Sequence, residues 1–285
     1  MIKTLKYFLQ SVFIYFFFIL GRLIGLDLSR KIFSYIFFKI GPLFKSKKIV
    51  EKNLNIFSKQ MPSINKDLII SKMWKNYGMT FIEYIFLDKF RKSEDFVSIE
   101  GESNLNDVII GKSPAIFISG HFSNFELMSM EITKKKIKLA TIYRPLNNFF
   151  LNPIMEFLRK KYICNHQIKK GINGVRDAIN YLKNNHSIAL MIDQRVSEGE
   201  RVNFFDEPAL TTTLPAQLAI KYNIPVIPVF IERNSENNFI LKFYTPLKIS
   251  GNDDKKNFTQ KLNQILEKMI EHNPNEWIWT HNRWK

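Results

Sequence analysis

From about residue 96 onward, short apolar runs alternate with longer segments of helical periodicity, and this alternation limits the possible folds more than any other feature of the chain. We predict strands at residues 115–119, 139–143, 187–192, 226–231 and 239–243, and helices at 125–134, 152–161, 174–183, 214–222 and 255–272. Strands that alternate with helices are typical of a buried, mostly parallel sheet. The predicted fold class is therefore α/β, with a mixed, mostly parallel sheet flanked by helices.

The segment before this alternation is helical. Apolar residues recur at three- and four-residue spacing from residue 48 to residue 90, and Pro62-Ser63 divides this stretch into two predicted helices. The chain contains no internal repeat and no low-complexity linker. We therefore predict one catalytic domain, residues 41–285, behind an anchoring segment, residues 1–40.

The first fifty residues are both the most basic and the most apolar part of the chain. They carry nine Lys and Arg residues against the single Asp27, and residues 7–21 are uncharged. A helix that spans a bilayer needs about 20 mostly apolar residues, so a single span and an interfacial helix both remain open. A signal peptide would need a small-residue cleavage pattern, which is missing, and a buried core helix would not explain the basic cluster. We predict attachment to an anionic membrane.

The composition limits the partners and the chemistry. A net charge of +16 suits a polyanion, which can be a nucleic acid, a membrane surface or an acidic protein. Because the excess is concentrated beside an apolar terminus rather than spread along a groove, the membrane is favoured and no nucleic-acid partner is expected. The single cysteine, Cys164, argues against a disulfide scaffold and a multi-cysteine zinc site, and no metal is expected.

The first predicted strand of the sheet ends in a block that can carry acid–base chemistry. Residues 120–126 read Gly-His-Phe-Ser-Asn-Phe-Glu. His121 is the side-chain type best suited to take a proton near neutral pH, and a carboxylate such as Glu126 on its other nitrogen would fix the tautomer. No Gly-x-Ser-x-Gly nucleophile elbow is present, so the base would activate a hydroxyl of the substrate. Alternatively, Ser123 and Glu126 form a capping box and His121 is a turn residue.

Polar residues also follow two other predicted strands. Arg144 comes after residues 139–143, and its planar fork suits phosphate or carboxylate, although a plain surface arginine has the same spacing. Asp193 and Gln194 follow residues 187–192 and are either site residues or the beginning of a loop. Ligand sites in α/β sheets lie at the carboxyl ends of the strands, which makes these positions candidates.

Aromatic residues gather in two further places. Phe204 and Phe205 either line an acyl groove or belong to a core strand, and the threonines at 211–213 either cap the next helix or contact a phosphate. Three of the four tryptophans lie in residues 277–284. They form either a packed C-terminal strap or a contact with a bilayer interface, and His281 is interpreted as structural.

Taken together and in this order, these blocks resemble the bacterial lipid A biosynthesis acyltransferases, within the His-x4-Asp/Glu glycerolipid acyltransferase superfamily. The matching residues are the basic, apolar N-terminus, 120–126, Tyr143-Arg144-Pro145, Asp193-Gln194, Phe204-Phe205 with Pro208-Ala209, and the ending Trp277-x-Trp279-x-His281-x-Arg283. The resemblance covers nearly the whole chain. It differs at Asp206, where the family often has Gly, and in the loop after Gln194, which lacks an Asp that well-known members have.

The resemblance implies an α/β fold anchored to the cytoplasmic face of the inner membrane. It implies His121 and Glu126 as the catalytic pair, and Asn124, Arg144, Asp193 and Gln194 as substrate-binding residues. The implied reaction transfers a fatty acyl chain from an acyl-carrier-protein thioester to a hydroxyl of a lipid A precursor, which is secondary acylation in lipopolysaccharide biosynthesis. No cofactor and no covalent enzyme intermediate are expected, and backbone N–H groups at the start of the helix after the motif would hold the oxyanion.

Three alternatives remain at the level of the sequence. A related acyltransferase would use acyl-coenzyme A and another glycolipid or an aminolipid acceptor, with the same catalytic blocks. A hydrolase would replace the acceptor hydroxyl with water. A basic nucleic-acid-binding protein would spread its Lys and Arg along one face.

Overall fold

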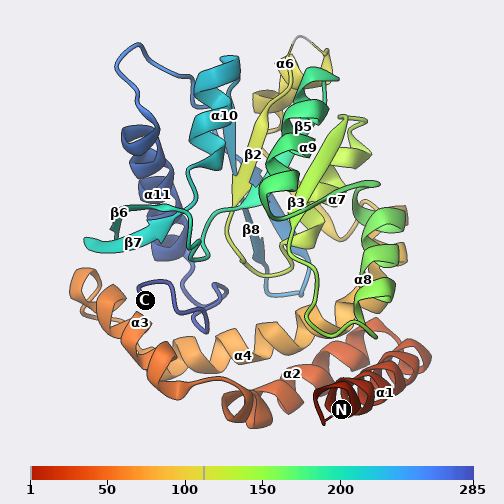
Figure 1. Ribbon diagram of the computed structural model, residues 1–285. Coiled ribbons are helices and arrows are strands. Elements are labelled where there is room, and N and C mark those ends of the chain that lie inside the picture. The colour runs from red at the N-terminus through yellow and green to blue at the C-terminus, as the bar shows by residue number, and fades with distance from the viewer. Residues whose placement is uncertain (1, 112) are drawn as a thin grey trace.

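The computed structural model describes residues 2–111 and 113–285, and its centre is a seven-stranded sheet (Figure 1). The strand order is β1-β9-β8-β2-β5-β3-β4. The strands are β1 (Val97–Glu100), β2 (Ile116–Ser119), β3 (Leu139–Tyr143), β4 (His166–Lys169), β5 (Ser187–Met191), β8 (Val226–Arg233) and β9 (Phe239–Phe243). Five neighbours, β8 to β4 in this order, are parallel, and β9 runs antiparallel to β8. The predicted mixed, mostly parallel sheet is confirmed.

All five predicted strands are present, but the structure adds four that the sequence analysis missed. β1 and β4 are four-residue strands at the two edges of the sheet, where only part of each strand is buried. β6 (Glu200–Phe204) and β7 (Glu207–Thr211) form a separate antiparallel hairpin. Short edge strands lack a continuous apolar run, so they give little signal in the sequence.

Helices lie on both sides of the sheet (Figure 1). They are α5 (Leu87–Lys92), α6 (Asn106–Ile109), α7 (Glu126–Lys134), α8 (Asn152–Leu158), α9 (Ile172–Lys183), α10 (Leu214–Tyr222) and α11 (Lys255–His272), with short 3-10 turns at Tyr84–Phe86 and Glu102–Leu105. α8 continues as a π-helical turn, Arg159–Ile163. The five helices predicted in this part of the chain are confirmed within a few residues at each end.

The N-terminal helices form a layer below the sheet, at the carboxyl ends of its parallel strands (Figure 1). They are α1 (Ile2–Ile24), α2 (Leu26–Phe44), α3 (Lys47–Gln60) and α4 (Lys66–Glu83), and the predicted break at Pro62 separates the last two. α2 packs along α4 through rings such as Phe33 and Phe81, whose centroids are 5.8 Å apart. The predicted boundary between residues 40 and 41 therefore falls inside a helix that is packed on the rest of the protein.

The C-terminal segment after α11 is a buried strap. The side chains of Trp277, Trp279 and Trp284 are buried, and Trp284 Nε1 donates a hydrogen bond to the Phe204 carbonyl (2.9 Å). Arg283 is fully buried and donates to the Thr211 hydroxyl (2.6 Å). The tryptophans thus pack inside the protein, which confirms the strap and rules out a bilayer contact for these three rings.

Candidate active site

His121 lies directly beyond β2, and a carboxylate from the neighbouring strand end holds its ring. Asp193 follows β5, which pairs with β2 in parallel, so both residues reach the same edge of the sheet. Asp193 Oδ1 lies 2.7 Å from His121 Nδ1, and Oδ2 accepts from the His121 backbone N–H (2.8 Å) and from Trp277 Nε1 (2.9 Å). Burial alone would raise the pKa of Asp193, but the charge and hydrogen bonds of His121 hold that pKa well below its usual value. The imidazole therefore has on Nδ1 a carboxylate whose ionised form is favoured.

The turn after His121 sets the direction of its side chain. Ser123 has a φ of 42°, a left-handed conformation that is uncommon for a residue with a side chain. The surrounding structure holds this turn, because the Ser123 N–H donates to the Glu276 carbonyl (3.1 Å) and its carbonyl accepts from Thr80 Oγ1 (3.2 Å). Phe125 then packs edge-on against the His121 ring at 4.6 Å between centroids. The ring is thus fixed on one side by Asp193 and on another by Phe125.

Gln194 and His281 lie on the remaining side of the His121 ring. The Gln194 side-chain nitrogen is 3.2 Å from His121 Nε2 and 2.7 Å from His281 Nε2. Burial lowers the pKa of His281 to about 4, so this imidazole is neutral at physiological pH and can accept a hydrogen bond. His281 was interpreted from the sequence as structural, but the structure places its ring 6.0 Å from that of His121.

Glu126 differs from the expectation. Instead of holding the imidazole, its carboxylate accepts from Tyr84 Oη (2.5 Å) and from Arg159 Nε (2.8 Å). Arg159 also lies over the rings of Tyr84 and Tyr143. The reason is geometric: the left-handed turn at Ser123 separates the two ends of the motif, and Glu126 begins α7 on the side of the π-helical turn. Asp193, expected as a substrate contact, takes the position expected for Glu126.

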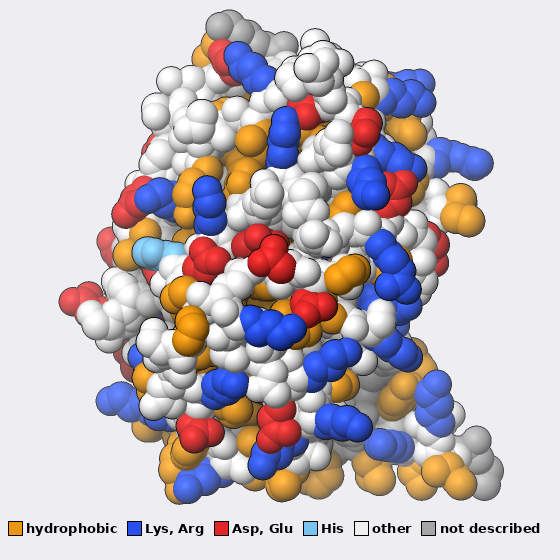
Figure 2. Space-filling model, turned by 90° about the vertical axis from the view of Figure 1, so that its left-hand side faces the viewer, with side chains coloured by type: hydrophobic (Ala, Val, Ile, Leu, Met, Phe, Trp, Pro, Cys, Tyr) orange, Lys and Arg blue, Asp and Glu red, His pale blue; other side chains and the backbone are white. Residues whose placement is uncertain are grey.

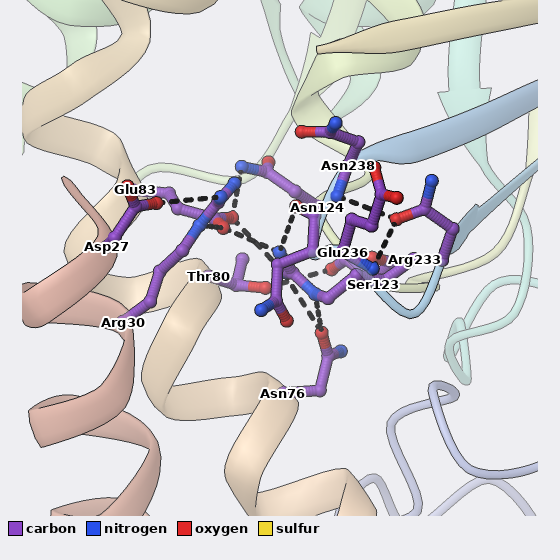
Figure 3. A network of polar contacts seen from close by, with 12 residues as sticks. Asp27, Arg30, Asn76, Thr80, Glu83, Ser123, Asn124, Arg233, Glu236 and Asn238 are labelled. Atoms are coloured by element: carbon purple, nitrogen blue, oxygen red, sulfur yellow. Dashed lines mark hydrogen bonds and ion pairs between the residues drawn. The ribbon is translucent and has the colours of Figure 1, made fainter.

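Asn124 is also turned away from the His121 ring. It is buried, and its Nδ2 donates to Glu83 Oε2 (2.9 Å), as Figure 3 shows. Glu83 in turn accepts from Arg30 and Arg233, which come from α2 and the end of β8. Asn124 therefore ties the motif to a buried polar network rather than pointing towards the His121 ring.

Arg144 lies at an exposed rim of the site, just after β3. β3 pairs in parallel with β4, and the Lys170 N–H donates to the Tyr143 carbonyl (2.9 Å), so Lys170 lies beside Arg144. Burial, with repulsion from Arg144, lowers the pKa of Lys170. The charges of Lys45 and Arg144 also disfavour a proton on His281. A cluster of like charges at a strand edge suits an anionic group of the substrate.

The structure resolves two alternatives from the sequence. Phe204 and Phe205 are buried against the strap, with Phe204 stacked on Trp284 at 5.5 Å, so they belong to the core and do not line a groove. Of the threonines before α10, Thr212 Oγ1 accepts from the Leu214 N–H (3.4 Å), as a capping side chain does, and the Thr213 hydroxyl accepts from Gln217 Nε2 (2.8 Å).

Of the predicted site residues, the structure brings His121, Asp193 and Gln194 together, leaves Arg144 at the rim, and points Asn124 and Glu126 into neighbouring clusters. Tyr84 and Arg159 were missed because nothing in their local sequence marks them, whereas His281 belongs to the ending that carries the resemblance but was interpreted as structural. In residues 2–111 and 113–285, no three His, Cys, Asp or Glu side chains form a group that would hold a metal ion.

The fold and this geometry define an α/β enzyme with a histidine–carboxylate pair at a strand edge. The model of the bacterial lipid A biosynthesis acyltransferase family matches residues 1–285. The chain belongs to that family, and it is an acyltransferase.

Curated relatives carry names of the same class. The lipid A biosynthesis palmitoleoyltransferase of Escherichia coli (strain K12) is 23% identical over 251 residues, which cover 85% of this chain and 80% of the relative. The lipid A biosynthesis acyltransferase of Haemophilus influenzae (strain ATCC 51907 / DSM 11121 / KW20 / Rd) is 24% identical over 247 residues, 83% of this chain and 76% of the relative. The lipid A biosynthesis lauroyltransferase of Escherichia coli (strain K12) is 22% identical over 246 residues, 84% and 78%.

Proposed function

We propose that the protein transfers a fatty acyl chain from an acyl-carrier-protein thioester to a hydroxyl of a lipid A precursor. The observation that carries the proposal is the His121–Asp193 pair. Because Nδ1 donates to Asp193, the Nε2 lone pair is the atom left to accept the acceptor's proton. The deprotonated oxygen then attacks the thioester carbonyl, the sulfur leaves with a proton, and no covalent enzyme intermediate is needed.

Gln194 occupies the proton-accepting side of His121 before the acceptor binds. When both imidazoles are neutral, the side-chain nitrogen of Gln194 can donate one hydrogen to His121 Nε2 and the other to His281 Nε2. In the opposite orientation of the amide, its oxygen would face the lone pair of His121 Nε2, which is unfavourable. The acceptor hydroxyl therefore displaces the amide from His121. The backbone N–H groups of Asn124 and Phe125, just before α7, would stabilise the oxyanion.

The cations at the rim bind and orient the acceptor. Arg144 and Lys170 lie at adjacent strand ends beside the catalytic pair, and neither has an ion-pair partner among the described residues. Guanidinium binds phosphate through two parallel hydrogen bonds, which fixes orientation as well as charge. We assign this rim to a phosphate of the glycolipid acceptor. Glu126 acts through Arg159 by holding the motif against the π-helical turn, which makes it a positioning residue.

The N-terminal helices provide the membrane contact. α1 is the one helix in the described chain that is long and apolar enough to cross a membrane, and only 17% of its most apolar window is buried. Its exposed apolar side chains are Ile2, Leu5, Phe8, Leu9, Val12, Phe13, Phe16, Ile19, Leu20 and Leu23. Figure 2 shows hydrophobic side chains along the lower margin of the molecule, with Lys and Arg directly above them. This pattern suits the cytoplasmic face of the inner membrane, with the cations at the headgroups.

The donor and acceptor are tested with the purified enzyme in mixed micelles. Acyl-carrier-protein and coenzyme A thioesters of the same chain are compared on a lipid A precursor, and mass spectrometry locates the added chain. We expect transfer from the carrier protein to a hydroxyl of an existing acyl chain. Preference for coenzyme A would overturn the donor. If cells with and without the protein had the same lipid A, the acceptor would be wrong.

A further inference from the structure

A cavity of about 780 Å³ lies between α2, α4, the turn that joins β8 to β9, and the segment that follows α11. None of the residues that line it belongs to the catalytic pair or to the Arg144 rim, so it is separate from the site described above. Its volume is within the range of small-ligand sites, which is roughly 300–1,000 Å³.

The charges around this cavity are unbalanced. It is lined by five cationic side chains, Arg30, Lys31, Lys72, Lys75 and Arg233, and by three acidic ones, Asp27, Glu236 and Glu276. Burial raises the pKa of Glu276 to about 7, so this carboxyl group is only partly ionised at neutral pH. The cavity is therefore electropositive.

Part of the excess charge is buried. Arg30 Nε and Arg233 Nη1 lie 2.7 Å from the same oxygen of Glu83, and Glu83 has no exposed surface. Two guanidinium groups thus share one carboxylate (Figure 3). Asp27 lies 4.0 Å from Arg30 but is 91% exposed, and Arg30 Nη2 has no hydrogen-bond partner among the described residues. Because an unbalanced buried cation is costly, an anion bound nearby would stabilise this arrangement.

The rim of the cavity combines free cations with apolar side chains. Lys31, Lys72 and Lys75 are exposed and form no ion pair within the described residues. On α2, Leu28 and Tyr35 are exposed and lie one turn on either side of Lys31. On α4, exposed Leu68 lies one turn before Lys72. Cations and apolar surface thus alternate along α2 and α4.

From these observations we infer that the cavity binds the phosphate of an anionic phospholipid, whose acyl chains lie along the apolar side chains of α2 and α4. Basic pockets between membrane-associated helices are suited to lipid headgroups, and Lys and Arg together favour phosphate over an uncharged headgroup.

A ligand bound in the cavity would also affect the catalytic motif. Glu83 binds Asn124, three residues after His121, and the same carboxylate holds Arg30 and Arg233. A phosphate that neutralises the two guanidinium groups would stabilise the network that fixes this loop. We therefore expect anionic phospholipid to raise kcat. This expectation rests on the proposed function, whereas the binding of phospholipid to the cavity can be measured independently of it.

The binding test uses the full chain in uncharged detergent and calorimetric titration with dihexanoyl phosphatidylglycerol, dihexanoyl phosphatidylcholine and inorganic phosphate. We expect phosphatidylglycerol to bind at least about tenfold more tightly than the other two. The variant Lys31→Ala/Lys72→Ala/Lys75→Ala changes exposed side chains only and should weaken this binding at least about tenfold. The matched control, Lys3→Ala/Lys6→Ala/Lys39→Ala, removes three cations from α1 and α2 outside the cavity and should change it less than twofold.

Equal losses in the two triple variants would overturn the inference, because binding would then depend on total charge alone. Equal affinity for inorganic phosphate would overturn the lipid as the source of the anion. If the cavity variant raised only the KM of the glycolipid acceptor and bound phosphatidylglycerol like the wild type, the cavity would belong to the acceptor. Circular dichroism of both variants checks that the fold is retained.

Discussion

The two ends of the His-x4-Glu motif lie only five residues apart, yet their surroundings differ. At the first end, His121 has one nitrogen on Asp193 and the other beside a side chain that can move away. At the second end, Glu126 lies in a closed cluster with Tyr84 and Arg159. Proton transfer needs a group with a free atom that faces the substrate, whereas a closed cluster holds position. We therefore assign proton transfer to His121 and the positioning of the motif to Glu126.

His121→Ala gives the largest expected loss, because it removes the base. We expect kcat to fall by about 10⁴-fold, the upper end for general-base catalysis, with an unchanged fold. His272→Ala, at an exposed position on α11, serves as the control and should retain full activity. Acyl transfer from the carrier protein under single-turnover conditions measures both, and near-normal transfer by His121→Ala would refute the assignment.

Asp193→Asn is expected to lower kcat by about 10²-fold or more. The amide cannot stabilise the imidazolium, and it favours the wrong tautomer of His121. Because the pKa of Asp193 is held low, the carboxylate stays ionised at acidic pH, and no loss of activity between pH 5 and 8 should arise from its titration. A kcat within threefold of the wild type would remove Asp193 from the mechanism.

Glu126→Gln should show the opposite balance, with a larger effect on stability than on chemistry. Breaking a largely buried ion pair leaves Arg159 uncompensated, so we expect a loss of about 2–4 kcal/mol in the free energy of unfolding, and about tenfold in kcat/KM. Urea unfolding and initial rates measure the two effects, with exposed Glu94→Gln as the control. If Glu126→Gln reduced kcat more than Asp193→Asn does, the division of roles would be reversed.

Arg144 tests the cationic rim, which lies near the His121 end of the motif. Replacement by Lys should raise the KM for the acceptor by about tenfold, nearly as much as replacement by Ala, since Lys keeps the charge but loses the bidentate fork. The donor KM should stay within twofold. An Arg144→Lys enzyme with wild-type kinetics would show that charge alone suffices there.

Glu276 should have the smallest effect on activity, although its backbone carbonyl supports the turn at Ser123. Burial raises its pKa from about 4.5 to about 7, so the folded state binds a proton more tightly than the unfolded state. Its contribution to stability is therefore complete below pH 4.5 and is lost as the pH rises through 7, up to about 3 kcal/mol. Urea unfolding of Glu276→Gln and of the wild type gives the difference in their free energies of unfolding at pH 5 and at pH 8. We expect this difference to favour the variant more at pH 8 than at pH 5. An equal difference at both pH values would contradict the assignment.

The sequence predicted well what depends on strand ends. His121, Arg144 and Asp193 each follow a buried apolar strand, and because the strands are parallel they meet at one edge. What it could not predict were contacts set by tertiary packing. The five-residue spacing suggested Glu126 as the partner of the imidazole, but the turn at Ser123 directs that carboxylate elsewhere. The true contact comes from 72 residues away.

The same limit applies to the C-terminal segment. Its tryptophans suggested either a packed strap or a bilayer contact, and the structure shows the strap. His281 belongs to the same block, but its contact with Gln194 could not be predicted, because it depends on where the strap packs. The periodicity of apolar residues predicts which side chains are buried, but it does not predict which distant loop packs against them.

Asp193 acts through His121, and a double-mutant cycle measures this coupling. Single-turnover transfer rates are measured for the wild type, His121→Ala, Asp193→Asn and the double variant. If the two residues work as one unit, the double variant will be within about twofold of His121→Ala, because Asp193 has nothing left to act on. If the two losses multiply, so that the double variant is a further 10²-fold slower, Asp193 acts independently of His121 and the account is contradicted.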